Sequence, residues 1–277
     1  MDSTTTGSCV GGCMGKDRVY RQDFPFYSFN ADRHNQADLV WYFQILQEIS
    51  LKHSQHVGLG WEELEKKGLA WVAFRNIIEI DRYVRWPQTV RVETWAGSIY
   101  KLYFPRMVRA FDEAGNRLFE SHSYWLLLDR NRHGRPVPPA PYLAIYGVPE
   151  STDFSRPTGF PSRLVPDEEL PQANVFMPPI LYQDTDFNMH VNNITYVKWF
   201  IESMPETFRD THKACFMDIN WNKQTFSSDV IKIITSSKDG TMQQDSFQHY
   251  LEKTDKEGNT TISSCCMTKW KAREEMS

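Results

Sequence analysis

Two stretches of this chain repeat the same order of predicted elements, and this repetition limits the possible folds more than any other feature. Each stretch has a short extended segment, one amphipathic helix and four strand-like runs. A turn signature recurs between two of the runs, as Asp112-x-x-Gly115-Asn116 and as Asp255-x-x-Gly258-Asn259. One helix followed by an antiparallel meander predicts a sheet wrapped around that helix. A second copy in the same chain would pair the sheet edge that one copy leaves open.

Apolar residues at helical spacing locate the two helices. The first follows Asp38, the predicted N-cap, and the second follows Asn192 or Asn193 and stops before Pro205. Alternating runs predict strands at 69–80, 89–95, 101–111 and 118–128, then at 215–221, 230–236, 246–253 and 260–270. The sequence therefore predicts an α+β fold of two tandem hotdog units, each an antiparallel sheet wrapped around a central helix.

Proline divides the chain. Eleven of its fifteen prolines lie between Pro136 and Pro179, which favours an extended linker because proline lacks an N–H group and restricts φ. The expected organisation has four parts: a disordered tail at 1–19, a first unit at 20–135, a linker at 136–174 and a second unit at 175–272.

Charge and cysteine usage restrict the function. A net charge of −4 argues against a nucleic-acid binder or a binder of anionic membranes. No apolar run approaches the roughly 20 residues that span a bilayer, and the first 15 residues do not resemble a signal peptide. The five cysteines are odd in number and complete no zinc spacing, so we expect a reducing, cytoplasmic compartment and neither metal nor cofactor.

Three polar residues stand at alternate positions directly before the second helix: Asp186, Asn188 and His190. In an extended segment this period turns all three side chains to one side, beside the partly positive start of the helix. A carboxylate, an amide and an imidazole there suit chemistry at an activated carbonyl, where negative charge develops on oxygen. The alternative is that they serve only as turn and capping residues.

The surrounding stretch, Asp184-Thr-Asp-Phe-Asn-Met-His-Val-Asn-Asn193, resembles the catalytic stretch of the acyl-ACP thioesterases of bacteria and plant plastids. The likeness covers about residues 20–270 and includes Ser28-Phe-Asn-Ala-Asp-Arg33 and Gly68-Leu-Ala-Trp-Val72. It implies hydrolysis of the thioester between a fatty acyl chain and acyl carrier protein, in fatty-acid biosynthesis. The implied partner is the carrier protein with its phosphopantetheine-linked acyl chain. Monomer and homodimer both remain open.

The resemblance also implies residue roles. His190, Asn188 and Asp186 correspond to the catalytic His, Asn and Asp of the family, and either Asp186 or His190 would be the base. Asn188 and the helix-start amides would hold the thioester oxygen; these amides belong to Val191, Asn192 and Asn193.

One position departs from the family pattern. A Glu, often followed by Cys, faces the motif in the family, whereas Gln224 and Thr225 stand there in this chain. Gln224 can orient a water molecule but cannot act as a base, because its amide does not titrate. A covalent cysteine mechanism is not expected.

The first unit is implied to form the pocket for the acyl chain. The substrate-binding candidates there are Trp41, Ile45, Trp71 and Phe74, with Phe43, Ile49 and Trp125 as further ones. At these spacings apolar residues also form ordinary core. Two alternatives remain for the whole protein: an acyl-CoA thioesterase of the same fold, or a weakly active or non-catalytic acyl-binding hotdog protein, which Gln224 favours.

Overall fold

The computed structural model describes residues 13–14, 18–148 and 163–273, and the chain divides into two compact units. Unit 1 comprises 1–37, 45–72 and 84–158, and unit 2 comprises 38–44, 73–83 and 159–277. Most of the predicted tail at 1–19 lies outside the described residues. Within it, Cys13–Met14 form strand β1, which pairs with β2.

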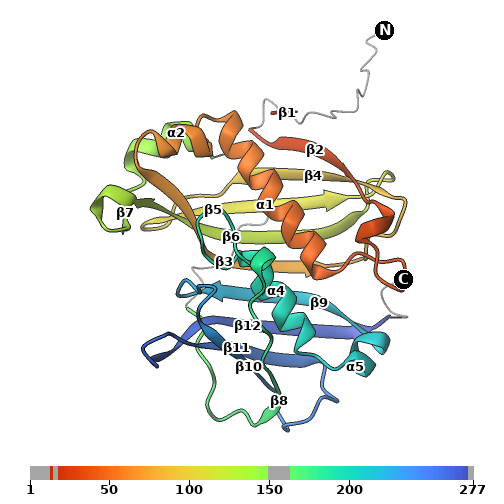
Figure 1. Cartoon of the computed structure of the whole chain (residues 1–277). Helices are drawn as coiled ribbons and strands as arrows, with labels where there is room; N and C mark the ends of the chain where they lie inside the picture. The colour runs from red at the N-terminus through yellow and green to blue at the C-terminus, as the bar shows by residue number, and fades with distance from the viewer. Residues whose placement is uncertain (1–12, 15–17, 149–162, 274–277) are drawn as a thin grey trace. The chain divides into compact units, whose positions relative to one another are not determined.

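Unit 1 contains an antiparallel sheet in the order β1-β2-β4-β5-β6, with β7 paired to β6. Its further strands are β2 (Tyr20–Pro25), β4 (Thr89–Ala96), β5 (Tyr103–Phe111), β6 (Arg117–Asp129) and β7 (Arg135–Pro136). Helix α1 (Leu39–His56) begins after Asp38, whose carboxylate accepts the Trp41 N–H at 2.9 Å, as predicted. Its last turns lie against this sheet (Figure 1). There, His53 stacks on Tyr20 of β2 with ring centroids 5.9 Å apart.

Unit 2 contains antiparallel strands in the order β3-β9-β12-β11-β10-β8. Its strands are β3 (Leu69–Ile80, from residue 73 on), β8 (Gln172–Phe176), β9 (His212–Trp221), β10 (Val230–Ser236), β11 (Ser246–Thr254) and β12 (Thr260–Ala272). Helix α4 (Asn193–Glu202) lies on this sheet (Figure 1). Phe200 lies 5.8 Å from the His249 ring of β11, and Ser203, just past the helix, contacts Thr235 of β10.

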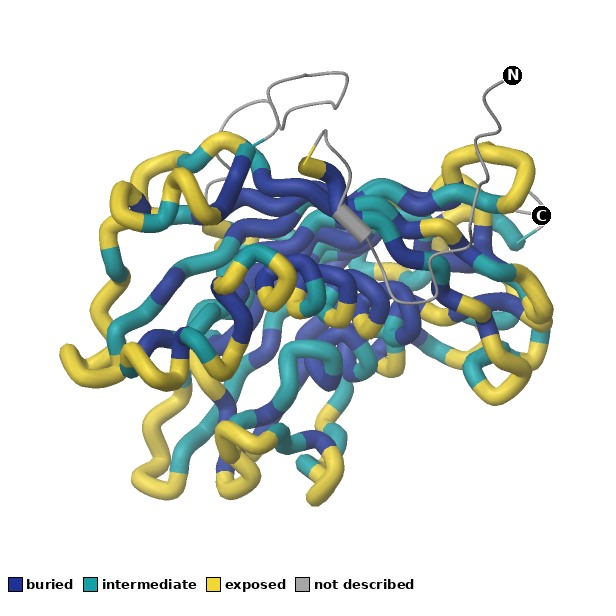
Figure 2. The backbone as a smooth tube through the Cα atoms, turned by 90° about the horizontal axis from the view of Figure 1, so that it is seen from above, coloured by how far each residue is buried: buried dark blue, intermediate teal, exposed yellow. Residues whose placement is uncertain are grey.

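The remaining helices are short. They are α2 (Trp61–Glu65), α3 (Leu143–Tyr146), α5 (Glu206–Thr211) and the 3₁₀ turns η1 (Ser28–Asn30), η2 (Arg130–Arg132), η3 (Ala140–Tyr142) and η4 (Tyr182–Asp184). Buried residues concentrate in the strands and in α1 and α4, whereas the turns between them are exposed (Figure 2).

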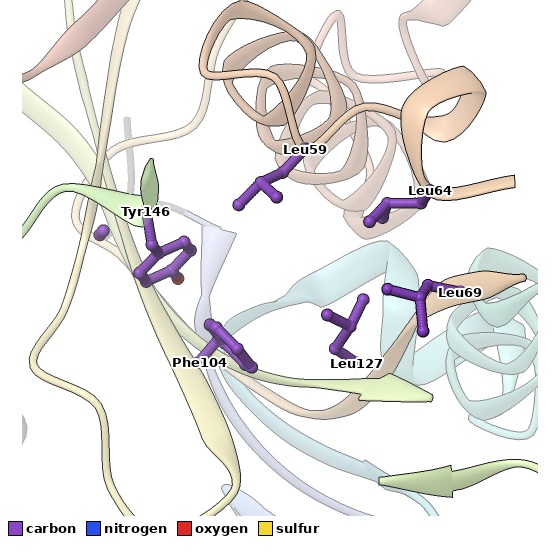
Figure 3. Packing of buried hydrophobic residues seen from close by; sticks show 7 residues of the cluster. Leu59, Leu64, Leu69, Phe104, Leu127 and Tyr146 are labelled. Carbon is purple, nitrogen blue, oxygen red and sulfur yellow. The ribbon is translucent and has the colours of Figure 1, made fainter. Parts of the chain in front are cut away.

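The expectation of an extended linker at 136–174 is wrong for its first part. Residues 140–146 form η3 and α3, and Tyr146 is only 2% exposed, packed in the core of unit 1 with Leu59, Phe104 and Leu127 (Figure 3). Proline is tolerated in the first turn of a helix, where its missing N–H has no partner to lose. Gly147, at φ 65°, then ends the helix.

Both predicted Asp-x-x-Gly-Asn turns are confirmed, between β5 and β6 and between β11 and β12. In the first, Asp112 N–H donates to the Asn116 carbonyl and the Asp112 carboxylate accepts the Asn116 N–H. Asp255 makes the same two bonds with Asn259 in the second. The two units therefore repeat local structure as well as element order.

The buried His249 predicts a pH dependence of stability. Its ring contacts the hydroxyls of Thr235 and Thr268 at 3.0 and 2.9 Å, and burial lowers its pKa from 6.5 to about 3. Between these values the unfolded chain binds the proton and the folded one does not. Stability present above pH 6.5 is therefore lost as the pH falls toward 3.

We expect His249→Gln to flatten the dependence of Tm on pH between 7 and 4, because glutamine keeps hydrogen bonding without titrating. The exposed His133, replaced by asparagine, which tolerates its left-handed backbone, serves as the control. Parallel Tm curves for wild type and His249→Gln would contradict the assignment.

Candidate active site

The polar motif before α4 forms a tight turn. Asp186 N–H donates to the His190 carbonyl at 2.9 Å, and Met189 N–H donates to the Asp186 carbonyl. Met189 has φ 63°, and the Asp186 carboxylate accepts the Asn188 N–H at 2.8 Å. The prediction of an extended segment with period two is therefore wrong. The aspartate bonds to backbone two residues ahead and so favours a turn.

The same turn stands before α1 in unit 1. Asp32 N–H donates to the Gln36 carbonyl, Asn35 has φ 58°, and the Asp32 carboxylate accepts the His34 and Gln36 N–H groups. Asp32 thus corresponds in backbone position to Asp186, and Gln36 to His190. Because unit 1 has no imidazole at the last position, Asp32 shows that an aspartate at the first position can shape this turn without a histidine.

Asp186→Asn and Asp32→Asn form a matched pair of variants. Asparagine keeps the side-chain oxygen that accepts the backbone N–H, so we expect each turn to persist and Tm to change little in both. Any activity that depends on His190 is expected to fall about tenfold or more in Asp186→Asn alone, because only this variant removes a carboxylate charge from the turn that carries His190. Equal activity in the two variants would show that Asp186 only shapes the turn.

Asp184 attaches the turn to the helix. This residue is 2% exposed, and its carboxylate accepts the Lys198 ammonium at 2.9 Å and the Leu181 N–H at 2.8 Å. Its carbonyl accepts the Asn192 N–H at 2.8 Å. Sequence reasoning assigned no role to Asp184, because its partner Lys198 is one turn into α4 and only the fold brings the two charges together.

Two of the three helix-start amides that were expected to hold the thioester oxygen are already hydrogen-bonded. Val191 N–H donates to the Thr225 carbonyl and Asn192 N–H to the Asp184 carbonyl, so neither is available to a substrate oxygen. Among the described residues, no acceptor binds the N–H of Asn193, the first residue of α4. The Asn192 side chain accepts the Ile194 N–H at 2.9 Å, which confirms it as the N-cap.

His190 is half-buried against the loop that joins β9 to β10. Its ring meets the edge of Phe226, with centroids 5.1 Å apart and planes at 75°. Lys253 lies 5.3 Å from the Phe226 centroid and forms a buried pair with Asp229 at 2.9 Å. In the described part of the chain, no hydrogen bond joins the His190 ring to the Asp186 carboxylate. Sequence reasoning missed the support from Phe226, which lies 36 residues further along the chain.

Gln224 lies in the same loop, exposed, after the end of β9 rather than on a strand. The neighbouring Thr225 is fully buried and holds Val191 through its carbonyl. The three cysteines described as free lie on β9 and β12, outside the motif. Burial raises the pKa of Cys265 to about 11 and that of Cys266 well above its ordinary value, which disfavours thiolates there.

The residues predicted to line the acyl pocket do not all lie in the same unit. Trp71 lines a pocket in unit 1 together with Trp125, and Ile45 is buried in the same unit. Trp41 and Phe74 belong to unit 2, so their assignment to the first unit is corrected. Residues 39–44 of α1 and 73–80 of β3 belong to unit 2, although both segments precede the linker in sequence.

Within the described residues, no helix is long and apolar enough to cross a membrane. The same residues contain no group of three or more His, Cys, Asp or Glu side chains placed to hold a metal ion.

Two family models match the chain. The acyl-ACP thioesterase N-terminal domain matches residues 17–140, and the acyl-ACP thioesterase C-terminal domain matches 171–272. The chain is 28% identical over 249 residues to oleoyl-acyl carrier protein thioesterase 2, chloroplastic, of Arabidopsis thaliana, covering 82% of this chain and 65% of that one. It is 25% identical over 257 residues to palmitoyl-acyl carrier protein thioesterase, chloroplastic, of Cuphea hookeriana, covering 89% and 61%. The chain thus spans less than two thirds of the length of these curated relatives.

Solved structures confirm the fold. An acyl-ACP thioesterase from Bacteroides thetaiotaomicron superimposes with a TM-score of 0.77 at 19% identity, covering 91% of this chain and 98% of that one. The 12:0-ACP thioesterase from Umbellularia californica gives a TM-score of 0.73 at 21% identity, covering 92% and 97%. The predicted double hotdog fold is therefore confirmed.

Proposed function

The chain belongs to the acyl-ACP thioesterase family, and from this premise we propose that it hydrolyses fatty acyl-acyl carrier protein to free fatty acid and the thiol form of the carrier. The turn at 184–193 is the observation that carries the proposal. It presents a half-buried imidazole and an amide at the start of α4, within the region matched by the C-terminal family domain.

In the proposed reaction His190 takes a proton from water as the water attacks the thioester carbonyl, and returns it to the departing thiolate. The geometry favours His190 over Asp186 as the base. The Asp186 carboxylate already accepts the Asn188 N–H, as Asp32 does in the corresponding turn of unit 1.

The oxyanion that forms on the carbonyl needs donors. The Asn188 side-chain amide and the Asn193 N–H at the positive end of α4 are the proposed pair, since the amides of Val191 and Asn192 are already bonded. Ordered backbone donors of this kind contribute most where water is excluded.

Thiol release from a panel of acyl carrier protein thioesters, with acyl chains from C8 to C18, tests the proposal. The matching acyl-CoA panel runs beside it, because both donors present the same phosphopantetheine thioester. Turnover that prefers the carrier-protein series supports the proposal. Turnover that prefers the CoA series would assign an acyl-CoA thioesterase, and binding of acyl donors without turnover would assign an acyl-binding protein.

Variants of Gln224 test whether the glutamine that stands in place of the family glutamate weakens catalysis. Because its side chain is exposed and cannot titrate, we expect Gln224→Ala to change kcat/KM on acyl-ACP less than about threefold. Gln224→Glu, which restores the family carboxylate, is expected to give a similarly small change. A large gain in the Glu variant would show instead that the natural protein is a slow member of its family.

Two further proposals concern the setting of the protein. A reducing, cytoplasmic compartment is supported by the odd number of cysteines. Monomer and homodimer remain alternatives that light scattering coupled to size-exclusion chromatography separates.

A further inference from the structure

The loop between β9 and β10 of unit 2 is closed by its own hydrogen bonds and is joined to the candidate catalytic turn. The Thr225 carbonyl accepts the Val191 N–H at 2.8 Å, which joins the loop to the turn. The next residue, Phe226, donates its N–H to the Asp229 carboxylate at 3.0 Å, and the Asp229 N–H donates to the Phe226 carbonyl at 3.0 Å. The backbone of Phe226 is therefore fixed directly beside the turn.

Unit 1 contains the same arrangement in the residues that precede β4. The Val84 carbonyl accepts the Ala37 N–H at 2.9 Å. The next residue, Arg85, donates its N–H to Oε1 of Gln88 at 2.8 Å, and the Gln88 N–H donates to the Arg85 carbonyl at 2.8 Å. Each unit therefore builds this loop with the same three kinds of hydrogen bond.

The comparison separates what the loop requires from what is particular to unit 2. In backbone position Arg85 corresponds to Phe226, and Gln88 corresponds to Asp229. The neutral amide of Gln88 supplies the oxygen that closes the loop in unit 1, so a carboxylate is not needed for the backbone shape. Unit 2 thus has an aromatic ring and a carboxylate where unit 1 has an arginine and an amide.

The carboxylate of Asp229 is paired with Lys253 of β11. The ammonium lies 2.9 Å from Oδ2, and the side chains of Lys253 and Asp229 are only 11% and 3% exposed. Removing two charges from water is unfavourable, and their pairing offsets that cost only in part. Because an amide closes the loop equally well in unit 1, the shape of the loop does not account for the ion pair.

The same ammonium group contacts the aromatic ring of the loop. Lys253 Nζ lies over the Phe226 ring, 5.3 Å from its centroid, within the range of a cation–π interaction. The Asp229 oxygen that binds this ammonium also accepts the Phe226 N–H. The ion pair therefore holds Phe226 at both its backbone and its ring.

The Phe226 ring in turn contacts the imidazole of His190, with centroids 5.1 Å apart and planes at 75°, a favoured geometry for two aromatic rings. We propose that Phe226, Asp229 and Lys253 are positioning residues for His190. The ion pair holds the Phe226 ring, and the ring keeps the imidazole in the orientation that the reaction requires. This role rests on the hydrolysis proposed above for His190.

The ring protons of His190 report the contact with Phe226 by NMR without any turnover. Their signals are assigned by their absence from His190→Gln, and the current of the Phe226 ring displaces them from their random-coil positions. We expect Phe226→Leu to remove about half or more of this displacement and Phe226→Tyr to retain it, because tyrosine restores the ring. Arg85→Leu, the counterpart in unit 1, should leave the signals in place. Wild-type displacement in Phe226→Leu would overturn the proposal.

A double variant separates the ion pair from the stability of the fold. Lys253→Met alone leaves the buried Asp229 charge without its partner and should lower Tm. Adding Asp229→Asn removes that charge and keeps an oxygen for the Phe226 N–H, so Tm should recover. We still expect the displacement of the His190 signals to shrink in this double variant, because no cation holds the Phe226 ring. Wild-type displacement there would overturn the role of the ion pair.

Steady-state hydrolysis of acyl-ACP measures the consequence for catalysis. We expect kcat to fall about tenfold in Phe226→Leu and in the double variant, with KM changed less than about threefold, because a misplaced catalytic group slows the chemical step. Phe226→Tyr should retain kcat. A purely structural role predicts wild-type kcat in the double variant once Tm has recovered, and that result would overturn the proposal. If the wild-type protein hydrolyses no acyl thioester, the proposed function fails, while the NMR signals still decide whether the ion pair orients His190.

Discussion

Replacing His190 with alanine is expected to lower kcat on acyl-ACP by about 10² to 10⁴, the usual contribution of a positioned acid–base group. Among the described residues, no backbone hydrogen bond involves the His190 ring, whereas the Asp186 carboxylate accepts the Asn188 N–H. The variant should therefore keep its Tm. The measurement is steady-state thiol release with saturating substrate, paired with a thermal melt.

The control is His133→Asn, which removes an exposed imidazole in unit 1 and should leave kcat unchanged. The ring of His190 also packs against Phe226, so a purely structural role predicts a different pattern. In that case His190→Phe, which restores an aromatic contact, would recover activity. Recovery of activity in His190→Phe would show that His190 takes no part in the chemical step.

Replacing Asp218 with alanine is expected to lower the free energy of unfolding by about 3–5 kcal/mol, as for other buried pairs that lose one partner. Asp218 on β9 binds Arg75 on β3 through both carboxylate oxygens, with Nε to Oδ1 at 2.6 Å, and both side chains are less than 10% exposed. Both residues belong to unit 2, where residues 75–79 of β3 pair with 216–220 of β9. Chemical denaturation with urea measures the loss.

The exposed pair Arg130 and Glu65 provides the comparison, because both side chains are more than 40% exposed. Glu65→Ala should cost less than about 1 kcal/mol. The double variant Arg75→Met with Asp218→Leu should recover much of the loss, since an apolar pair leaves no buried charge. A loss below about 1 kcal/mol in Asp218→Ala would show that water or another group compensates Arg75.

Local signals account for what could be predicted. Strands β3 and β10 have the bounds predicted from alternation, because side chains that alternate between core and solvent record the sheet directly in sequence. Asp38 and Asn192 cap their helices as expected, since a cap bonds to backbone only two or three residues away. The motif around His190 was found for the same reason, because it is contiguous.

The sequence by itself therefore determined the order of the main elements, the duplication and the position of the candidate catalytic turn. Tertiary structure alone decided what each group of that turn contacts. The Thr225 carbonyl accepts the Val191 N–H, and Phe226 packs against the His190 ring. The physical reason is that periodicity and capping depend on neighbours along the chain. Hydrogen-bond occupancy and burial depend on which distant segments pack together, and no local pattern records that.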